Sequence, residues 1–451
     1  MSEQERSGQG SASNLAVVIL AAGNGEHLKT RRPEALHAVG GKTLLAHALT
    51  AAQCLVAAPD IVVVVPTGET QVREAAESAG CKIVELAERQ GRGNALQSAR
   101  RAIDSYENIV VLPADLPLLR PETVAKLERS HRAEKAAMTI LTAPGIADET
   151  VPGIYAFRAD ALLKHLDELP ADRARGEVSL ADMAVLLRAA DEAVVKVVMN
   201  DGEEALQAKT IPELVALDAK LRAATASRLM GAGVTIYRPE TCVIDADVEV
   251  AADTVIEPFV QLLGNTKIGA ACRIRSYSVL ESCTLGDNVL IRPSCMLTES
   301  SIAEGADIGP FARMRMGCEV GEKVHVGNFV ELKKAKLQRG VKAGHLAYLG
   351  DAEIGADVNI GAGVITCNYD GVRKHVTQIG EGAFVGSDST LVAPVKIGAG
   401  AYVGAGSCIT KEVPADALAL ARALQVVKEG WAAERRARRK LEAAAREDSK
   451  R

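Results

Sequence analysis

Aromatic side chains are scarce in this sequence: Phe, Trp and Tyr together make up 3% of its 451 residues. Hydrophobic residues as a whole still reach 48%, so the protein's cores must consist mainly of Val, Ile, Leu and Ala. A chain of this length is too long for one ordinary core, and we expect two or three domains.

The sequence also lacks features that mark several other classes of protein. No run approaches the roughly eighteen apolar residues that cross a membrane, and residues 1–14 are polar and rich in Ser and Gly, unlike a signal peptide. The net charge of −5 argues against a general nucleic-acid binder. The nine Cys include no CxxC pair, which is typical of free thiols in a reducing compartment. We therefore expect a cytoplasmic protein with a disordered lead-in over 1–14, no membrane contact and no nucleic-acid partner.

Residues 15–200 alternate apolar runs with segments of helical composition. The predicted buried parallel strands are Leu15–Leu20, Asp60–Val65 and Asn108–Pro113, and the predicted helices between them include Lys42–Ala52 and Gly93–Ile103. This alternation indicates a Rossmann-like α/β domain over 15–200. Residues 201–232 are mainly helical in composition, and we expect them to form a linker.

The second half of the chain has a different period, in which an aliphatic residue followed by a small or polar residue recurs. The aliphatic members are Ile268, Leu285, Ile302, Val320, Leu337, Ile354, Ile379 and Ile397, at spacings of 17, 17, 18, 17, 17, 25 and 18. Three hexapeptides, about eighteen residues, make one coil of a parallel β-helix. A chance run of such pairs in a β-sandwich is the alternative, and the near-constant spacing argues against it. We predict a β-helix of hexapeptide repeats over 233–415 and a tail with a helix over 416–451.

The interval of 25 contains an insertion within TCNYDGVRKHV, Thr366–Val376. Solenoid proteins place insertions on loops that project from one face, often the binding face. This loop is polar and basic, so we expect it to take part in a site.

Several motifs in the second half match one known family closely. They are GPFARMR, HVGNFVELKKA, KAGHLAYLGDAEIGADVNIGAG, ITCNYDG, FVGSD and LVAPV. On these motifs the chain resembles the bifunctional bacterial N-acetylglucosamine-1-phosphate uridyltransferase / glucosamine-1-phosphate N-acetyltransferase family. The resemblance implies a nucleotidyltransferase-like domain followed by a left-handed parallel β-helix. It also implies a homotrimer that binds acetyl-CoA and glucosamine 1-phosphate between neighbouring β-helices, in the biosynthesis of UDP-N-acetylglucosamine.

Acetyl transfer to an amine requires a base, and His345 in KAGHLAYLG is the predicted one. An unperturbed imidazole, with a pKa of about 6.5, suits this work near neutral pH. The resemblance assigns His345 the role of catalytic base, whereas a lone histidine without this motif would more often be structural. This half-reaction needs no metal.

The resemblance also implies the binding residues. Glucosamine 1-phosphate would be held by Arg315, Lys333, Tyr348, Asn359 and Lys374. The coenzyme site would consist of Ala362, Asn368, Tyr369, Ser387, Ala405 and Arg422, with Asn368 and Ser387 near the thioester. Arginine offers a bidentate fork for phosphate and lysine a point charge. We expect Lys334 to be a solvated neighbour of Lys333, and Cys367 to be a small inward residue and not a nucleophile.

The N-terminal half retains the scaffold of the family's uridyltransferase site. By the resemblance, Leu20, Gly23 and Gly91 match nucleotide-binding positions and Asp115 matches one Mg²⁺ ligand. Elsewhere the chain departs from the family's pattern. Glu26-His27 replaces Thr-Arg, Glu34 replaces Lys, Lys209 lies near the position of the second metal ligand, Val151-Pro152 alters Asn-Thr-Gly, and much of the sugar-contact segment is missing across Leu141–Phe157.

We therefore predict an acetyltransferase whose uridyltransferase half is impaired, with Mg²⁺ and UTP bound only if that half is active. The fully bifunctional enzyme is the first alternative, and a non-catalytic trimeric scaffold is the second. A domain kept for folding, assembly or effector binding, or a redirected transferase with another substrate, stays open for the N-terminal half.

Overall fold

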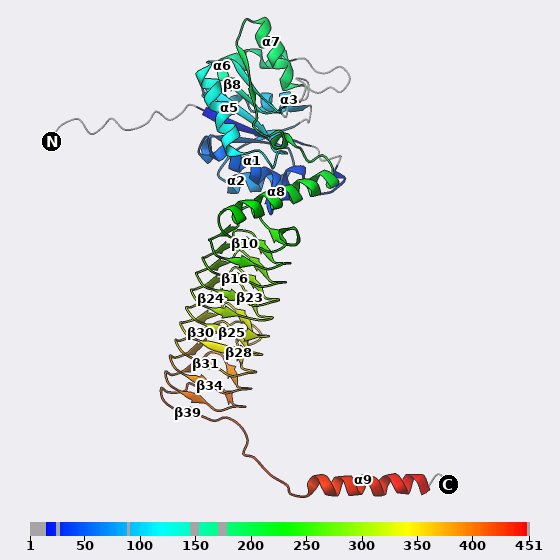
Figure 1. Cartoon of the computed structure of the whole chain (residues 1–451), viewed down its shortest axis with the longest axis vertical. Helices are drawn as coiled ribbons and strands as arrows, with labels where there is room; N and C mark the ends of the chain where they lie inside the picture. Colours follow the sequence, from blue (N-terminus) through cyan, green and yellow to red (C-terminus); the bar gives the residue numbers. More distant parts are fainter. Residues whose placement is uncertain (1–14, 24–27, 88–90, 145–152, 170–177, 449–451) are drawn as a thin grey trace, which may run out of the picture. The chain divides into compact units, whose positions relative to one another are not determined.

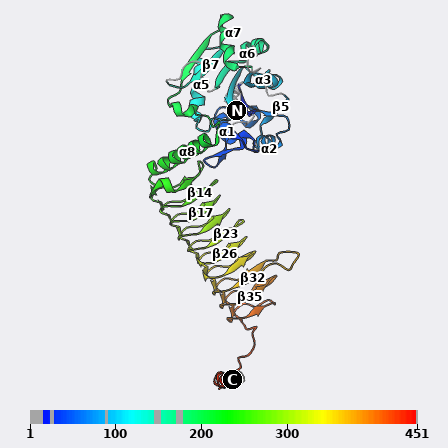
Figure 2. The same cartoon turned by 90° about the vertical axis from the view of Figure 1, so that its right-hand side faces the viewer.

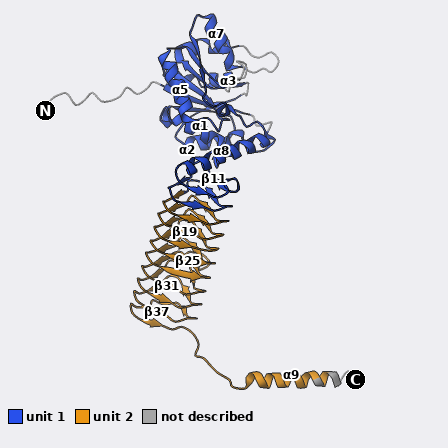
Figure 3. Ribbon diagram, in the orientation of Figure 1, with its two compact units in different colours: residues 1–266 blue, residues 267–451 orange. Residues whose placement is uncertain are grey.

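The computed structural model describes residues 15–23, 28–87, 91–144, 153–169 and 178–448. Two compact units make up the chain, Met1–Thr266 (unit 1) and Lys267–Arg451 (unit 2) (Figure 3). The predicted lead-in over 1–14, the Glu26-His27 pair and Val151-Pro152 lie outside the described residues.

A seven-stranded sheet organises the first part of unit 1, in the order β5-β4-β1-β6-β8-β7-β9. Its strands are β1 (Leu15–Leu20), β4 (Ile61–Pro66), β5 (Lys82–Leu86), β6 (Asn108–Pro113), β7 (Met138–Thr142), β8 (Tyr155–Arg158) and β9 (Val194–Val198). The three predicted parallel strands are confirmed as β1, β4 and β6. Strand β8 runs antiparallel to both β6 and β7, so the sheet is mixed.

Both faces of this sheet are apolar, because alternate residues of β1 enter two different cores. Leu15, Val17 and Ile19 belong to one cluster, whereas Ala16 and Leu20 belong to the other. Helices cover both faces (Figure 1). They are α1 (Leu44–Gln53), α2 (Thr70–Ser78), α3 (Gly91–Ser98), α4 (Arg100–Ile103), α5 (Pro121–Ala133), α6 (Ala159–His165) and α7 (Met183–Ala189). A short hairpin, β2 (Ala38–Val39) with β3 (Lys42–Thr43), precedes α1.

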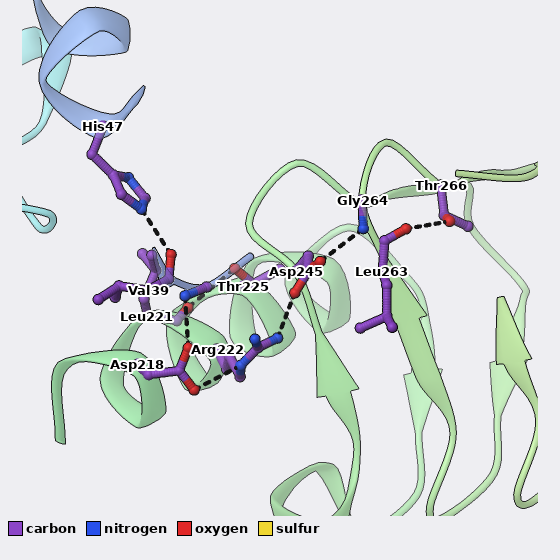
Figure 4. Close-up of polar contacts among 11 residues, drawn as sticks. Val39, His47, Asp218, Leu221, Arg222, Thr225, Asp245, Leu263, Gly264 and Thr266 are labelled. Atoms are coloured by element: carbon purple, nitrogen blue, oxygen red, sulfur yellow. Dashed lines mark hydrogen bonds and ion pairs between the residues drawn. The ribbon is translucent and has the colours of Figure 1, made fainter. Parts of the chain in front are cut away.

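Helix α8 (Ile211–Gly231) begins with a capping box, in which the Thr210 hydroxyl and the Glu213 carboxylate each bond the other residue's backbone N–H. Within the helix, Arg222 donates to Asp218 and Asp245 at 2.8 and 2.7 Å (Figure 4). Burial alone would lower the pKa of Arg222, but the hydrogen bonds to these two carboxylates raise it.

Unit 1 also contains the first strands of a β-helix, which are β10 (Thr235–Ile236), β11 (Val243–Ile244), β12 (Glu249–Val250), β13 (Val255–Ile256) and β14 (Gln261–Leu263). Strand β10 pairs in parallel with β13, and β11 with β14. The two oxygens of the Asp245 carboxylate are divided between α8 and this region, since Oδ2 accepts the Gly264 N–H at 2.7 Å (Figure 4).

Unit 2 consists of three parallel sheets that take successive strands of each coil in turn (Figure 1). The β28 sheet contains β16 (Arg273–Ile274), β19 (Leu290–Ile291), β22 (Asp307–Ile308), β25 (His325–Asn328), β28 (Lys342–His345), β31 (Asn359–Ile360), β34 (Phe384–Val385), β37 (Tyr402–Val403) and β39 (Leu418–Ala419). The β29 sheet contains β17 (Val279–Glu281), β20 (Met296–Thr298), β23 (Arg313–Arg315), β26 (Glu331–Lys333), β29 (Tyr348–Gly350), β32 (Ile365–Cys367), β35 (Thr390–Val392) and β38 (Cys408–Ile409). The β30 sheet contains β15 (Lys267–Ile268), β18 (Thr284–Leu285), β21 (Ser301–Ile302), β24 (Glu319–Val320), β27 (Lys336–Leu337), β30 (Ala352–Ile354), β33 (Thr377–Ile379) and β36 (Val395–Ile397).

All eight aliphatic residues of the predicted repeat are buried, and all lie in the β30 sheet. Small residues are needed where the chain turns between sheets. A Cβ atom on Gly386, for example, would lie 2.6 Å from the backbone nitrogen of Ala405. The predicted parallel β-helix of hexapeptide repeats is therefore confirmed.

Two segments extend from this ladder of strands. The predicted insertion is a loop over 368–376, between β32 and β33, and it projects from the strands (Figure 2). Helix α9 (Trp431–Asp448) lies in the predicted tail. Among the described helices, none combines the length and the apolar character that crossing a bilayer requires.

Candidate active sites

One corner of the β-helix, between the β28 sheet and the β29 sheet, carries the predicted base together with predicted coenzyme residues. The registers of β28, β31, β34 and β37 put His345, Ala362, Ser387 and Ala405 at equivalent positions of successive coils. We call these four residues the corner column. At about 4.8 Å between neighbouring strands, its three steps span roughly 14 Å. An extended ligand can therefore lie along this corner.

His345 ends strand β28 and is exposed. Its Nδ1 atom lies 2.6 Å from Oδ1 of Asn328, the equivalent residue of the preceding coil. Because an amide oxygen only accepts hydrogen bonds, this contact requires a proton on Nδ1. The neutral ring then carries its lone pair on Nε2, which is the atom able to act as a base.

Three of the predicted sugar-phosphate residues lie on the neighbouring β29 sheet. Arg315 on β23 and Lys333 on β26 are register partners, and Tyr348 follows on β29. The Arg315 guanidinium donates twice to Oε1 of Glu331, at 2.9 and 2.7 Å. These bonds raise the pKa of Arg315 and fix the direction of its side chain.

Lys333 is the unusual member of this face, because it is a lysine with only 8% of its surface exposed. Lys374, on the inserted loop, acts directly on the ammonium group of Lys333. The neighbouring Lys374 and, to a smaller extent, desolvation lower the pKa of Lys333. Two adjacent cations repel one another unless an anion lies between them, so this is where a phosphate would bind most favourably.

The inserted loop is held by Asp370 and Asn368. One oxygen of Asp370 accepts the backbone N–H groups of Val372 and Arg373 at 2.8 and 2.6 Å, and the other contacts Nε2 of His375 at 2.7 Å. The Arg373 N–H and then His375 hold the pKa of Asp370 well below its usual range. Asn368 is buried, and its amide nitrogen donates to Asp351.

The remaining predicted residues lie on separate elements of the fold. Asn359 lies on the β28 sheet, a different sheet from that of Arg315. Tyr369 is 60% exposed, and its hydroxyl donates to the Gly371 carbonyl at 2.6 Å. Arg422 donates to the carbonyl of Ala405, at the end of the corner column, at 2.8 Å.

The two lesser predictions at this site have different outcomes. Lys334 is exposed, as predicted. The prediction that Cys367 points inward is wrong, because Thr366 is the buried residue of β32 and Cys367 is half-buried. Burial still raises the pKa of the Cys367 thiol, which disfavours the reactive thiolate.

The sequence analysis missed four residues that position this site: Asn328, Glu331, Asp351 and Asp370. Asn328 could have been found, because it precedes His345 by 17 residues, which is one coil. The other three are acidic residues on exposed motifs, and nothing in the residue pattern indicates their partners.

The N-terminal candidates lie at or just after the ends of β1 and β6 and at the start of α3, all in unit 1. Leu20 ends β1 and accepts the Ala114 N–H through its carbonyl at 3.2 Å. Gly23 lies against Glu34, since a Cβ atom there would be 2.1 Å from Oε2 of that carboxylate. Gly91, with a φ of +87°, begins helix α3. A carboxylate beside this glycine turn is unusual for a site that receives phosphates.

Asp115 follows β6, and burial raises the pKa of its carboxyl group. Its Oδ2 atom lies 3.7 Å from Nη2 of Arg92, and its Oδ1 atom accepts a hydrogen bond from Gln207 at 3.4 Å. Lys209 adds a second positive charge nearby. The neighbours of this predicted Mg²⁺ ligand are therefore largely cationic.

The fold and the two sites define a class of transferase, in which a nucleotidyltransferase domain precedes a hexapeptide-repeat β-helix. The MobA-like NTP transferase domain family matches residues 17–207, the GMPPB C-terminal domain family matches 239–336, and the bacterial transferase hexapeptide family matches 377–411. The chain is 47% identical to the bifunctional protein GlmU of Koribacter versatilis, over 94% of this chain and 98% of that relative. It is 43% identical to that of Solibacter usitatus, over 94% and 97%. The chain belongs to the bifunctional GlmU family and is an enzyme.

Among solved structures, Rv0371c from Mycobacterium tuberculosis H37Rv is 20% identical, with a TM-score of 0.35 over 46% of this chain and 98% of that one. A score this low says nothing about activity. The curated relatives, in contrast, match both halves of the chain. Nothing in these comparisons indicates a degenerate N-terminal domain, and they favour the bifunctional alternative over the impaired enzyme of the sequence analysis.

Proposed function

We propose that the β-helix of this chain transfers the acetyl group of acetyl-CoA to the amine of glucosamine 1-phosphate. The corner column carries this proposal. A base, His345, lies in register with three candidate coenzyme contacts. The cationic face of Arg315 and Lys333, joined by Lys374, supplies the charge that a sugar phosphate needs.

The chemistry follows from the arrangement around His345. Nε2 of the imidazole takes a proton from the sugar's amine, which attacks the thioester carbonyl as the neutral nucleophile. The new C–N bond forms, the C–S bond breaks, and CoA leaves as the thiolate or thiol. Asn328 keeps the ring in the tautomer that leaves Nε2 free, so the base is ready before the substrate arrives. Asn368 and Ser387 would lie near the thioester.

We also propose that the enzyme works as a homotrimer. The residues that follow Asn328 and His345 on the same corner are Phe329 and Leu346, and each is more than half exposed. The Phe329 ring stacks on that of Phe311, with centroids 5.2 Å apart. Such an exposed apolar ladder beside the base supports burial against a second copy. Phe329→Asp should yield monomers in light scattering and abolish acetyl transfer. A monomeric wild type would contradict the trimer, and an unchanged trimer in the variant would contradict burial of Phe329 between copies.

The second activity, uridylyl transfer from UTP to N-acetylglucosamine 1-phosphate, is favoured by membership of the bifunctional GlmU family. The Glu34 carboxylate against Gly23 and the cations around Asp115 support the opposite hypothesis of an impaired half. The nine free cysteines support a place in the cytoplasm, where thiols stay reduced.

One purified sample tests both activities. CoA release from acetyl-CoA with glucosamine 1-phosphate measures the first, and pyrophosphate release from UTP with N-acetylglucosamine 1-phosphate measures the second. We expect CoA release that is lost in His345→Ala. Failure of the wild-type protein to release CoA, while its trimer and unfolding transition are intact, would contradict the acetyltransferase. Pyrophosphate at an ordinary enzymatic rate would exclude the impaired half, and its absence would support it.

A further inference from the structure

The surroundings of Asp115 carry an inference that goes beyond the family's two activities. Two basic residues from separate segments act on its carboxylate, Arg92 at the start of α3 and Lys209 before α8. Gln207 donates to the other oxygen of the same carboxylate. The Asp115 side chain is 18% exposed and that of Arg92 39%, so the carboxylate end of this pair is largely shielded from water.

This donor set does not fit a magnesium ion. Mg²⁺ needs oxygen ligands in near-octahedral geometry and is usually held by one or two carboxylates together with substrate phosphates. Among the described residues, the charged groups that act on Asp115 are the guanidinium of Arg92 and the ammonium of Lys209, and both repel a dication.

The position of Arg92 is built into the fold. Gly153 has a φ of +84°, and a Cβ atom there would lie 2.0 Å from Nη1 of Arg92. The guanidinium therefore packs directly on the Gly153 backbone, in space that any other residue would fill. Gly91, also at positive φ, starts α3 immediately before Arg92. Two glycines thus allow this arginine to reach Asp115.

The formal charges show what the two cations can replace. One carboxylate (−1) with one Mg²⁺ (+2) leaves a net charge of about +1 for a phosphate ligand. Asp115 (−1) with Arg92 (+1) and Lys209 (+1) leaves the same net charge. The basic side chains also bring N–H donors, and the arginine fork matches two phosphate oxygens.

We propose that Arg92 and Lys209 take the place of the divalent cation, so that this site binds a pyrophosphate-bearing ligand such as a nucleoside triphosphate without a metal. Such a site would bind its ligand without a metal ion, and this holds for any reaction that the bound ligand then undergoes. Gly153 acts as a positioning residue, because it fixes Arg92 beside Asp115.

Calorimetric titration of the full chain tests this, with UTP and with inorganic pyrophosphate, each in EDTA and in excess Mg²⁺. We expect the dissociation constants in EDTA to stay within about threefold of those in Mg²⁺. Arg92→Thr and Lys209→Asn should each weaken binding in EDTA by about tenfold, the loss of one charge-assisted contact. Gly153→Ala should do the same by displacing Arg92.

The matched control is Arg101→Thr, which removes an exposed arginine of α4 and should leave both titrations unchanged. The unfolding transition of each variant shows whether it is folded. Absence of binding in EDTA overturns the proposal, whether or not Mg²⁺ restores it. So does tight Mn²⁺ binding to the free protein, followed by electron paramagnetic resonance, that is lost in Asp115→Asn. Pyrophosphate release in Mg²⁺ is measured in a separate assay. Uridylyl transfer can therefore be detected even if the metal-free binding proposed here is not.

Discussion

The imidazole of His345 and the amide of Asn328 lie one above the other on neighbouring coils, with Nδ1 and Oδ1 2.6 Å apart. In a solenoid, the register of the backbone ladder sets which side chain of the preceding coil lies next to a given residue. The proposed base is thus oriented by the repeat, through the residue one coil away.

Replacing Asn328 should therefore affect the chemical step more than substrate binding. Asn328→Ala should lower kcat for acetyl transfer by about 10- to 100-fold with little change in KM, because the ring loses its fixed tautomer. Asn328→Asp keeps an acceptor and adds a negative charge that favours the imidazolium. The acidic limb of its pH–rate profile should move to higher pH. CoA release measured from pH 5 to 9 gives both quantities, and an unchanged profile in Asn328→Asp would count against the assigned tautomer.

The pair of ammonium groups on Lys333 and Lys374 makes a second prediction. Because the Lys374 charge lowers the pKa of Lys333, removing it in Lys374→Met should raise that pKa. At neutral pH the variant should show a KM for glucosamine 1-phosphate about tenfold higher, from the loss of one phosphate contact. The further rise in KM at alkaline pH, where Lys333 loses its proton, should begin at a higher pH than in the wild type.

The control for this pair is Lys334→Met, which removes an exposed neighbouring lysine of the same charge. It should leave KM and its pH dependence close to those of the wild type. Equal effects of Lys334→Met and Lys374→Met would mean that general surface charge, and not a phosphate site, governs binding.

The inserted loop should depend on Asp370, although this residue is no candidate for contact with substrate. Asp370→Ala removes the acceptor for two backbone N–H groups and the partner of His375, so the loop that carries Lys374 should lose its shape. We expect a higher KM for glucosamine 1-phosphate, by about tenfold, with a smaller effect on kcat. Asp370→Asn keeps an oxygen acceptor for the N–H groups and should recover most of the loss. Faster hydrogen exchange of 371–375 in Asp370→Ala alone would confirm the cause.

Much of the proposed acetyltransferase site could be predicted from the sequence, because its residues follow the spacing of the repeat. His345, Ala362, Ser387 and Ala405 are separated by 17, 25 and 18 residues, which are the same intervals as the repeat itself. A parallel β-helix turns such intervals into a column, so linear spacing specifies three-dimensional contact. The α/β half offers no such rule, and the direction of β8 could not be read from its four residues.

Other features depend on side-chain detail that a pattern does not contain. The strands of the β-helix are two to four residues long, and a shift of one residue exchanges the inward and outward faces. For this reason Cys367 was predicted to point inward, whereas the buried residue of β32 is Thr366. The contact of Arg92 with Asp115 depends on the missing Cβ of Gly153, across 61 residues of sequence. Charged residues on exposed motifs could be identified as candidates, but their partners could not.

The stability of unit 1 should fall in mild acid, and His131 should make a clear contribution to this loss. His131 on α5 is 3% exposed, and its Nδ1 atom lies 2.9 Å from the Thr139 hydroxyl. Burial lowers the pKa of His131 to about 4, from an ordinary value near 6.5. Between these two values the unfolded chain takes up a proton that the folded one does not, so the free energy of unfolding falls as pH decreases. The loss approaches about 3 kcal/mol at pH 4.

His131→Gln isolates this contribution, because glutamine can keep a hydrogen bond to Thr139 and does not titrate. At pH 7.5 the wild type should be at least as stable as the variant, since its neutral imidazole is fully packed. On going to pH 5, the free energy of unfolding of the wild type should fall by about 2 kcal/mol more than that of the variant. Urea unfolding at the two pH values, followed by the slowest-exchanging amides of β6 and β7, reports on this unit alone. If the difference between the two proteins is the same at both pH values, His131 is not the group that titrates.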